Sequence, residues 1–356
     1  MTVQQQTSLF SPYQLGPIAL ANRVVMAPMT RSRAIGNVPN ELMARFYGAR
    51  ADAGLLITEG TAPAPDGLGY ARIPGIYTDE QVAGWKLVTE AVHARGGKIF
   101  VQLMHTGRVG HPLNLPAGAE LLAPSAIAAP GAMWTDQEQL QPHPVPREMT
   151  AADIRKAVDG FAYAANRAIE AGFDGVELHG ANGYLIEQFL NPAANERKDA
   201  YGSDRNRFAL EVVEAVAAAI GAERVGIRLS PYSVAQGHVP FDGIDEQYAA
   251  LAKALGALGL AYVHVVDHSA LGAPPVPQAV KDLIRRNFGR TYITAGGYDR
   301  ATAEQDLEAG KGDLVAFGRP FIANPDYVSK LQSGAALTPA NAETFYTPGE
   351  AGYTDY

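Results

Sequence analysis

The sequence predicts an α/β protein with a single domain, a (β/α)8 TIM barrel that spans residues 1–356. Eight short apolar runs recur along the chain, and most of them precede a segment with helical periodicity. The runs are rich in valine, isoleucine and leucine without polar alternation, as strands buried on both faces require. The alternative is an open parallel sheet, which usually carries a glycine-rich dinucleotide turn after its first strand. Met26-Ala-Pro-Met-Thr30 is not such a turn, so the pattern favours the barrel.

The elements follow in order. Residues 8–20 are expected to form a β-hairpin lid that closes the bottom of the barrel. Residues 105–149 and 181–204 follow strands three and four and are rich in Pro, Gly and Asn, so they should be long loops over the catalytic face. The expected strands are 23–27, 54–58, 98–103, 175–178, 224–229, 262–266, 291–295 and 314–317. The expected helices are 41–52, 79–95, 150–171, 205–220, 245–258, 276–287, 299–309 and 325–332.

Composition narrows the function. The net charge is −8 and no run of lysine or arginine forms a stripe, so nucleic acid and anionic membranes are not expected partners. The chain has no cysteine, which excludes disulfides, thiolate metal sites and a cysteine nucleophile. No stretch is long and apolar enough to cross a bilayer, and Met1–Ser8 lacks the features of a secretory signal. A cytoplasmic enzyme or binding protein is expected, either a monomer or a homodimer.

The segment Gly175-Val-Glu-Leu-His-Gly-Ala-Asn-Gly-Tyr184 carries the strongest chemical signal. A short buried strand runs into His179, Asn182 and Tyr184, and two glycines place these side chains on an irregular turn. His179 and Asn182 are two neutral donors that can converge on one carbonyl or nitro oxygen, while Tyr184 can supply a proton. The alternative is a strand end with a capped turn and a surface tyrosine.

Polar residues or glycines also fall at the ends of other strands, where a barrel builds its active site. Strand one ends at Ala27-Pro28-Met29-Thr30, strand two at Gly60, strand three carries Gln102 and strand five carries Arg228. With the elements after strands seven and eight, seven of eight strands contribute to the same edge. Packing alone explains that coincidence poorly.

The loops after strands seven and eight predict a phosphate site. Glycines let backbone N–H groups approach an anion, and an arginine adds a charge-assisted contact. Gln102 can donate to and accept from a uracil-like edge, and Arg228 could stabilise an anionic reduced ring. A planar polar head with a phosphate tail describes flavin mononucleotide. Ordinary turn glycines and a structural role for Arg228 inside the barrel are the alternatives. The phosphate residues are Gly296, Gly297, Gly318 and Arg319.

At this point the chain resembles the Old Yellow Enzymes, FMN-dependent ene-reductases that include N-ethylmaleimide and pentaerythritol tetranitrate reductases. The likeness covers essentially the whole chain, with the motifs in order and at barrel spacing. They are Asn22-Arg-Val-Val-Met-Ala-Pro-Met-Thr-Arg31, Val101-Gln-Leu-Met-His-Thr-Gly-Arg108, His179-Gly-Ala-Asn-Gly-Tyr-Leu-Ile-Glu-Gln-Phe-Leu190, Ile227-Arg-Leu-Ser-Pro231, Ala295-Gly-Gly297, Phe317-Gly-Arg-Pro320 and the tail Phe345-Tyr346 to Gly352-Tyr-Thr-Asp-Tyr356.

The resemblance implies a role for each site residue. His179 and Asn182 would grip the substrate oxygen, and Tyr184 would protonate the α-carbon. Met104 is a departure, because the relatives closest to the nitrate-ester and maleimide reductases carry tryptophan there, and a flexible thioether should enlarge and soften the pocket. The remaining roles are backbone contacts to the flavin from Ala27, Pro28 and Gly60, a hydrogen bond to flavin O4 from Thr30, the pyrimidine edge at Gln102 and Arg228, the phosphate at Gly297, Gly318 and Arg319, and pocket aromatics at Tyr70 and Tyr346.

The resemblance therefore implies tightly bound, non-covalent FMN, NADPH or NADH as a transient reductant, and small electron-poor alkenes as substrates. These are enones, enals, maleimides and nitroalkenes. One alternative is a metal-dependent or Schiff-base barrel. His264 and His268 lie about 13 Å apart along a strand at ~3.3 Å per residue, so they can share an ion only if the strand ends between them. Lys98 begins its strand and suits a Schiff base poorly. A flavin-binding sensor or ligand carrier on the same scaffold is the second alternative.

Overall fold

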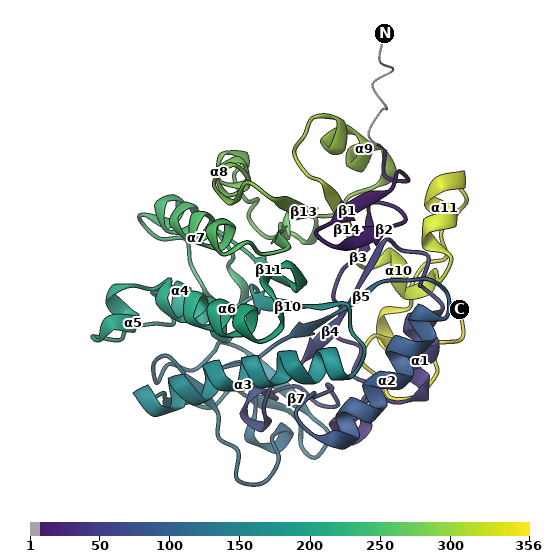
Figure 1. Ribbon diagram of the computed structural model, residues 1–356. Helices are drawn as coiled ribbons and strands as arrows, with labels where there is room; N and C mark the ends of the chain where they lie inside the picture. Colours follow the sequence, from purple (N-terminus) through teal and green to yellow (C-terminus); the bar gives the residue numbers. More distant parts are fainter. Residues whose placement is uncertain (1–7) are drawn as a thin grey trace.

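The computed structural model describes residues 8–356 and shows strands enclosed by a ring of helices (Figure 1). Residues 1–7, which carry most of the segment expected to lack a secretory signal, lie outside the described residues. Eight parallel strands close into a barrel in the order β10-β11-β12-β13-β14-β3-β4-β5. Each expected run supplies one strand: β3 (Val24–Met26), β4 (Leu55–Thr61), β5 (Ile99–Leu103), β10 (Gly175–Gly180), β11 (Val225–Leu229), β12 (Tyr262–Val266), β13 (Thr291–Ala295) and β14 (Leu314–Phe317).

The barrel strands are buried because both of their faces are covered. All seven residues of β4 are buried, and so are all five of β5, β11 and β12. Side chains from one face fill the barrel, and those from the other pack against the helices. This double burial explains why the strands appear in the sequence as continuous apolar runs.

The expected helices are all present. α2 and α3 each begin with a capping box, formed by Thr78 with Gln81 and by Thr150 with Asp153, which satisfies backbone donors in the first turn. The helices are α1 (Glu41–Gly48), α2 (Asp79–His93), α3 (Ala151–Glu170), α6 (Arg207–Ile220), α7 (Ile244–Leu258), α8 (Gln278–Phe288), α9 (Arg300–Glu308) and α11 (Tyr327–Ser333), with the short α10 (Pro320–Ala323) after β14.

The N-terminal hairpin consists of β1 (Tyr13–Leu15) and β2 (Ile18–Leu20), paired antiparallel. The Tyr13 hydroxyl bonds to Thr291, the first residue of β13, at 2.8 Å. Leu15 and Leu20 pack with apolar residues from several barrel strands. The hairpin therefore lies at the end of the barrel where strands begin, opposite the active-site edge, and Figure 1 shows it beside β13, β14 and β3.

The two segments expected as loops are more regular than the sequence suggested. Residues 105–149 contain the parallel pair β6 (Leu122–Ala123) and β9 (Arg147–Glu148) and the antiparallel hairpin of β7 (Ala132–Thr135) and β8 (Gln139–Pro142). Residues 181–204 contain α4 (Leu185–Leu190) and α5 (Ala200–Ser203). These elements could not be predicted from the sequence, because each is too short to show a periodic pattern and follows irregular turns.

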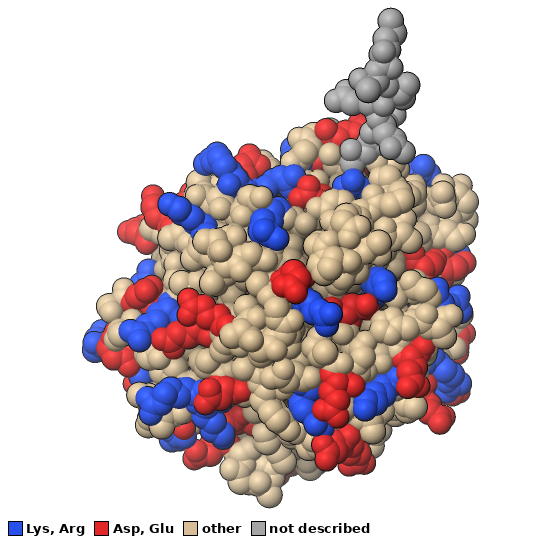
Figure 2. Space-filling view, viewed as in Figure 1, with Lys and Arg blue, Asp and Glu red and all other residues tan. Residues whose placement is uncertain are grey.

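On the face seen in Figure 2, positive and negative side chains are interspersed, and neither sign forms a continuous stripe. Within residues 8–356, no helix is long and apolar enough to cross a membrane.

Candidate active site

Two adjoining cavities open where the barrel strands end. The larger has a volume of about 1170 Å³ and the smaller about 490 Å³. Pro28, Thr30, Asn182, Arg228 and Tyr346 line both. Every site residue predicted from the sequence lines one cavity or the other. The larger also contains Gly60, Tyr70, Gln102, Met104, His179 and Tyr184, and the smaller contains Ala27, Gly296, Gly297, Gly318 and Arg319.

His179 lies at the end of β10, in register with Arg228 on β11. Burial lowers the pKa of His179 well below its ordinary value, and the nearby Arg228 lowers it further, so the imidazole is neutral. Its Nδ1 is buried without a hydrogen-bond partner among the described residues. A neutral histidine with a free buried nitrogen is able to bind a ligand atom.

The turn after β10 places Asn182. Its φ is 58° and that of Gly183 is 83°, a left-handed conformation that asparagine and glycine adopt most readily. The Glu187 carboxylate fixes this turn, because it accepts the Gly183 N–H at 2.6 Å and the hydroxyl proton of Ser230. Ser230 in turn accepts the Asn182 N–H at 2.9 Å.

The Asn182 side chain is oriented by a second contact. Its Oδ1 lies 2.8 Å from Nε2 of His268, which follows β12. Since an amide oxygen only accepts, His268 donates, and the amide nitrogen of Asn182 has no partner among residues 8–356. Burial lowers the pKa of His268, in keeping with a neutral donor. Asn182 therefore has donor N–H groups available to a ligand.

Tyr184 begins the turn that leads into α4. Its hydroxyl lies 2.9 Å from that of Tyr70, and its ring meets His179 edge to face, with 4.8 Å between centroids. Burial raises the pKa of Tyr184 above its ordinary value, although the hydrogen bond from Tyr70 lowers it in part. The phenol is protonated at neutral pH, as a proton donor requires.

A buried polar network lies beneath these groups. Glu177, fully buried in β10, accepts hydrogen bonds from Gln102 at 2.8 Å, Tyr262 at 3.1 Å and His264 at 2.8 Å. Burial raises the pKa of Glu177, but His264, Arg228 and Gln102 together lower it below its ordinary value. The carboxylate is therefore ionised and balances the buried charge of Arg228.

These groups fit FMN. Nε of Arg228 is buried and has no partner among the described residues, and such a group is costly unless a ligand satisfies it. At the other end, Gly297 has a φ of 71°, and a Cβ there would lie 2.3 Å from Ala270, so only glycine fits. Arg319 is exposed and forms no ion pair with any residue from 8 to 356, which leaves it available to a phosphate. We call the ligand-facing groups at the strand ends the inner wall: Thr30, Gly60, Gln102, His179, Asn182 and Arg228.

Met104 is buried against Gly60. A Cβ on that glycine would lie 2.5 Å from the Met104 sulfur, so the thioether fills the space above the β4 backbone. Met104 belongs to an apolar cluster that Tyr70 and Tyr184 pack against. The sequence predicts that Met104 borders the substrate pocket, and in the structure it lines the larger cavity.

The opposite side of the larger cavity comes from loops, and we call it the outer wall: Ile35, Arg72, Trp134, Leu140 and Tyr346. Trp134 on β7 and Leu140 on β8 are directly paired across the hairpin, so their side chains share one face. Met133 points the other way and packs with Tyr70 and Tyr184. The hairpin thus has one side on Tyr70 and Tyr184 and one side at the mouth of the cavity.

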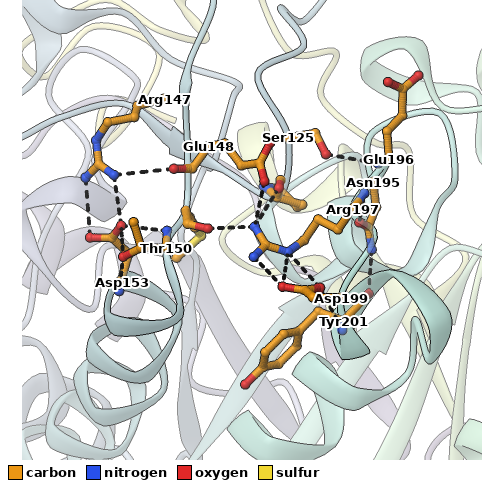
Figure 3. Close-up of polar contacts among 12 residues, drawn as sticks. Ser125, Arg147, Glu148, Thr150, Asp153, Asn195, Glu196, Arg197, Asp199 and Tyr201 are labelled. Carbon is orange, nitrogen blue, oxygen red and sulfur yellow. Dashed lines mark hydrogen bonds and ion pairs between the residues drawn. The ribbon is translucent and has the colours of Figure 1, made fainter.

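Pro124 and Met149, at the two ends of the part of the chain that carries this hairpin, meet at the Arg197 side chain, drawn in Figure 3. The Arg197 side chain is only 6% exposed, and its Nη1 donates to the carbonyls of Pro124 at 2.9 Å and Met149 at 2.6 Å, on either side of the segment. Asp199 pairs with the rest of the guanidinium. Arg147 joins Asp153 at the start of α3. These contacts tie the hairpin segment to the segment that follows the catalytic turn.

Sequence reasoning missed Glu177, Glu187 and His268 as parts of the site. It considered His268 only as a metal ligand with His264, but these histidines bond to Asn182 and Glu177 respectively. Between residues 8 and 356, no group of three or more metal-binding side chains is placed to hold an ion. A signal for His268 existed, because it follows the end of the one strand to which no site residue had been assigned.

Comparisons with known proteins agree with this geometry. The pattern of the family described as NADH:flavin oxidoreductase / NADH oxidase matches residues 8–338. The chain is 42% identical to 12-oxophytodienoate reductase 7 of Oryza sativa over 99% of this chain and 95% of that protein. It is 44% identical to a chanoclavine-I aldehyde reductase of Penicillium roqueforti, over 98% and 96% respectively.

Solved structures are equally similar. Morphinone reductase superposes with a TM-score of 0.95 at 44% identity, covering 100% of this chain and 97% of that one. An Old Yellow Enzyme homologue from Zymomonas mobilis gives a TM-score of 0.93 at 39% identity, covering 98% and 99%. The structure of morphinone reductase in complex with tetrahydroNAD gives a TM-score of 0.93 at 45% identity, covering 98% of this chain and 97% of that one. The barrel and its whole length are thus shared.

Proposed function

The chain belongs to the NADH:flavin oxidoreductase / NADH oxidase family, and we propose that its His179, Asn182 and Tyr184 activate an electron-poor alkene for reduction. It is an FMN-dependent NAD(P)H oxidoreductase of activated carbon–carbon double bonds. The chemistry that bound FMN would supply is hydride transfer from the nicotinamide to the β-carbon of the alkene. The observation that carries our proposal is the convergence of two neutral donors and one protonated phenol on the same cavity.

His179 and Asn182 would bind the carbonyl or nitro oxygen of the substrate. Both are neutral N–H donors, so they would stabilise the negative charge that develops on this oxygen by hydrogen bonding, without transferring a proton to it. His268 and Glu187 keep the amide of Asn182 in position. Enones, enals, maleimides and nitroalkenes share the required oxygen next to the double bond.

Tyr184 would then protonate the α-carbon. Its proton is free to point into the cavity when Tyr70 donates to the Tyr184 oxygen, and that same bond stabilises the phenolate left behind. Solvent protons restore the phenol after turnover. Gln102 and Arg228 would hold the flavin edge, while Gly297, Gly318 and Arg319 would hold its phosphate.

The test compares the two half-reactions in Tyr184→Phe. Under anaerobic conditions NADPH should bleach the yellow protein at the wild-type rate, because Tyr184 takes no part in that step. Recovery of the colour with cyclohexenone should slow by about 10²- to 10⁴-fold, the usual contribution of a positioned general acid. Tyr163→Phe, on an exposed part of α3, is the matched control and should leave both rates unchanged.

Full-rate reoxidation of Tyr184→Phe would remove this residue as the donor. A colourless wild-type protein that fails to take up added FMN would contradict the whole assignment.

A further inference from the structure

The mouth of the larger cavity is bordered by exposed apolar side chains. Ile35 is 59% exposed, Trp134 45%, Leu140 65% and Tyr346 62%. We call these four the apolar rim. They come from three separate segments, since Trp134 and Leu140 share one hairpin, and they are a third of the twelve large hydrophobic residues exposed in the described chain. Single exposed hydrophobics need no explanation, but a group gathered around one opening indicates a binding surface.

Arg72 holds the rim together. Each nitrogen of its guanidinium contacts a different segment: Nε donates to the carbonyl of Ser32 at 3.1 Å, Nη2 to that of Tyr346 at 2.8 Å, and Nη1 pairs with Asp136 in the hairpin turn. Its own φ is 57°, a conformation that a non-glycine residue adopts only when its surroundings fix it. The rim is therefore a built arrangement rather than a chance exposure of loops.

The hairpin has further attachments. Asn114 donates to the Trp134 carbonyl at 2.8 Å and to that of Gly69 at 2.9 Å. The indole nitrogen of Trp134 donates to Asp136 at 3.1 Å. As a result, the polar atoms of Trp134 and Arg72 are already bonded within the protein, and the rim offers a ligand mainly apolar surface.

We propose that the apolar rim is an outer subsite for a neutral, apolar body of the substrate, remote from the reacting alkene. This inference rests on the proposed function and adds a substrate class to it: acceptors whose enone carries an extended hydrocarbon portion. Each methylene that reaches the rim leaves water, which favours binding by up to about fourfold. Glu343 lines the same cavity without an ion pair among the described residues, so a terminal carboxylate on that body should bind less well.

The experiment measures kcat/KM with NADPH for straight-chain alkyl vinyl ketones, from methyl to octyl. The expected result is a rise of about two- to fourfold for each added methylene, once the chain reaches the rim, carried mainly by KM. The analogue of the octyl compound that ends in a carboxylate should lose much of that gain. Equal kcat/KM across the series would overturn the inference while leaving the proposed function intact, whereas no reduction of any member would contradict the proposed function.

Two variants locate the effect. Leu140→Ser should flatten the dependence on chain length, and Leu337→Ser, an equally apolar exposed residue at 46%, should keep it. Arg72→Ala should flatten it as well, because Arg72 positions the rim from three segments, and Arg72→Lys should restore little since one nitrogen cannot reach all three. A wild-type slope in Leu140→Ser and Arg72→Ala would refute the subsite. A flat wild-type series together with dimers that Leu140→Ser dissociates would show that a second copy covers the rim, which also refutes it.

Discussion

The inner and outer walls face each other across one cavity but are built differently. The inner wall presents polar groups that are buried and incomplete, such as Nδ1 of His179 and Nε of Arg228. The outer wall presents polar groups that are already paired, such as Arg72 with its three partners, and apolar groups that are exposed. A buried donor without a hydrogen-bond partner destabilises the protein until a ligand satisfies it. Exposed hydrocarbon is stable in water and gains free energy only when a ligand covers it. The inner wall should therefore determine the cofactor and chemistry, and the outer wall the choice among substrates.

The largest expected effect comes from a substitution in the inner wall and is a loss of FMN affinity. Arg228→Ala should weaken FMN binding by roughly 30-fold to several thousand-fold, because it removes a buried donor and leaves the Glu177 carboxylate without its cation. Equilibrium titration followed by FMN fluorescence measures the dissociation constant. Arg72→Ala removes a cation from the outer wall and should change the affinity for FMN far less. An equal loss of FMN affinity in the two variants would show that cofactor binding does not depend mainly on the inner wall.

An intermediate effect concerns the orientation of Asn182. Asn182→Ala should weaken the binding of phenol ligands by about 10- to 100-fold, since a hydrogen bond to a charged oxygen contributes roughly 1.5–3 kcal/mol. His268→Phe keeps Asn182 but removes the donor to its Oδ1, so the loss should be only about 2- to 10-fold. The absorbance change on titration with a phenol gives both values. His93→Phe, at the end of α2, is the control. If His268→Phe binds phenols as tightly as wild type, the amide is oriented by the backbone turn alone.

The same contrast explains what the sequence could predict. Strand ends of a barrel meet at one edge, so residues such as Gln102 and Arg228 could be assigned to one site from their positions alone. His268 lies two residues past its strand and acts through Asn182, which spacing does not reveal. Arg72 meets Asp136 across 64 positions and Tyr346 across 274, so its role depends on how distant loops fold together. No local pattern encodes these contacts, and the outer wall was therefore missed apart from Tyr346, which the family resemblance supplied.

The smallest effect is on stability and tests the burial of Glu59, which lies next to Gly60 of the inner wall but contacts Tyr47 of α1. Glu59 precedes Gly60 and is fully buried, accepting the backbone N–H of Arg31 at 3.2 Å. Burial raises the pKa of Glu59 to about 7, although the hydrogen bonds and charge of Arg31 oppose the shift. A carboxyl whose pKa is raised in the folded state binds its proton more tightly there than in the unfolded chain. Stability is therefore lost as the pH rises from the unfolded value near 4.5 to about 7, and the loss is complete above that.

The melting temperature of the FMN-bound protein should accordingly fall between pH 5 and pH 8, by a few degrees for a change on the order of 3 kcal/mol. Glu59→Gln keeps the shape of the side chain and its acceptor oxygen but cannot ionise, so this part of the pH dependence should vanish. At pH 8 the melting temperature of the variant should therefore be higher relative to wild type than it is at pH 5. Glu214→Gln, exposed on α6, should melt like wild type throughout. If Glu59→Gln follows the wild-type curve, Glu59 titrates normally despite its burial.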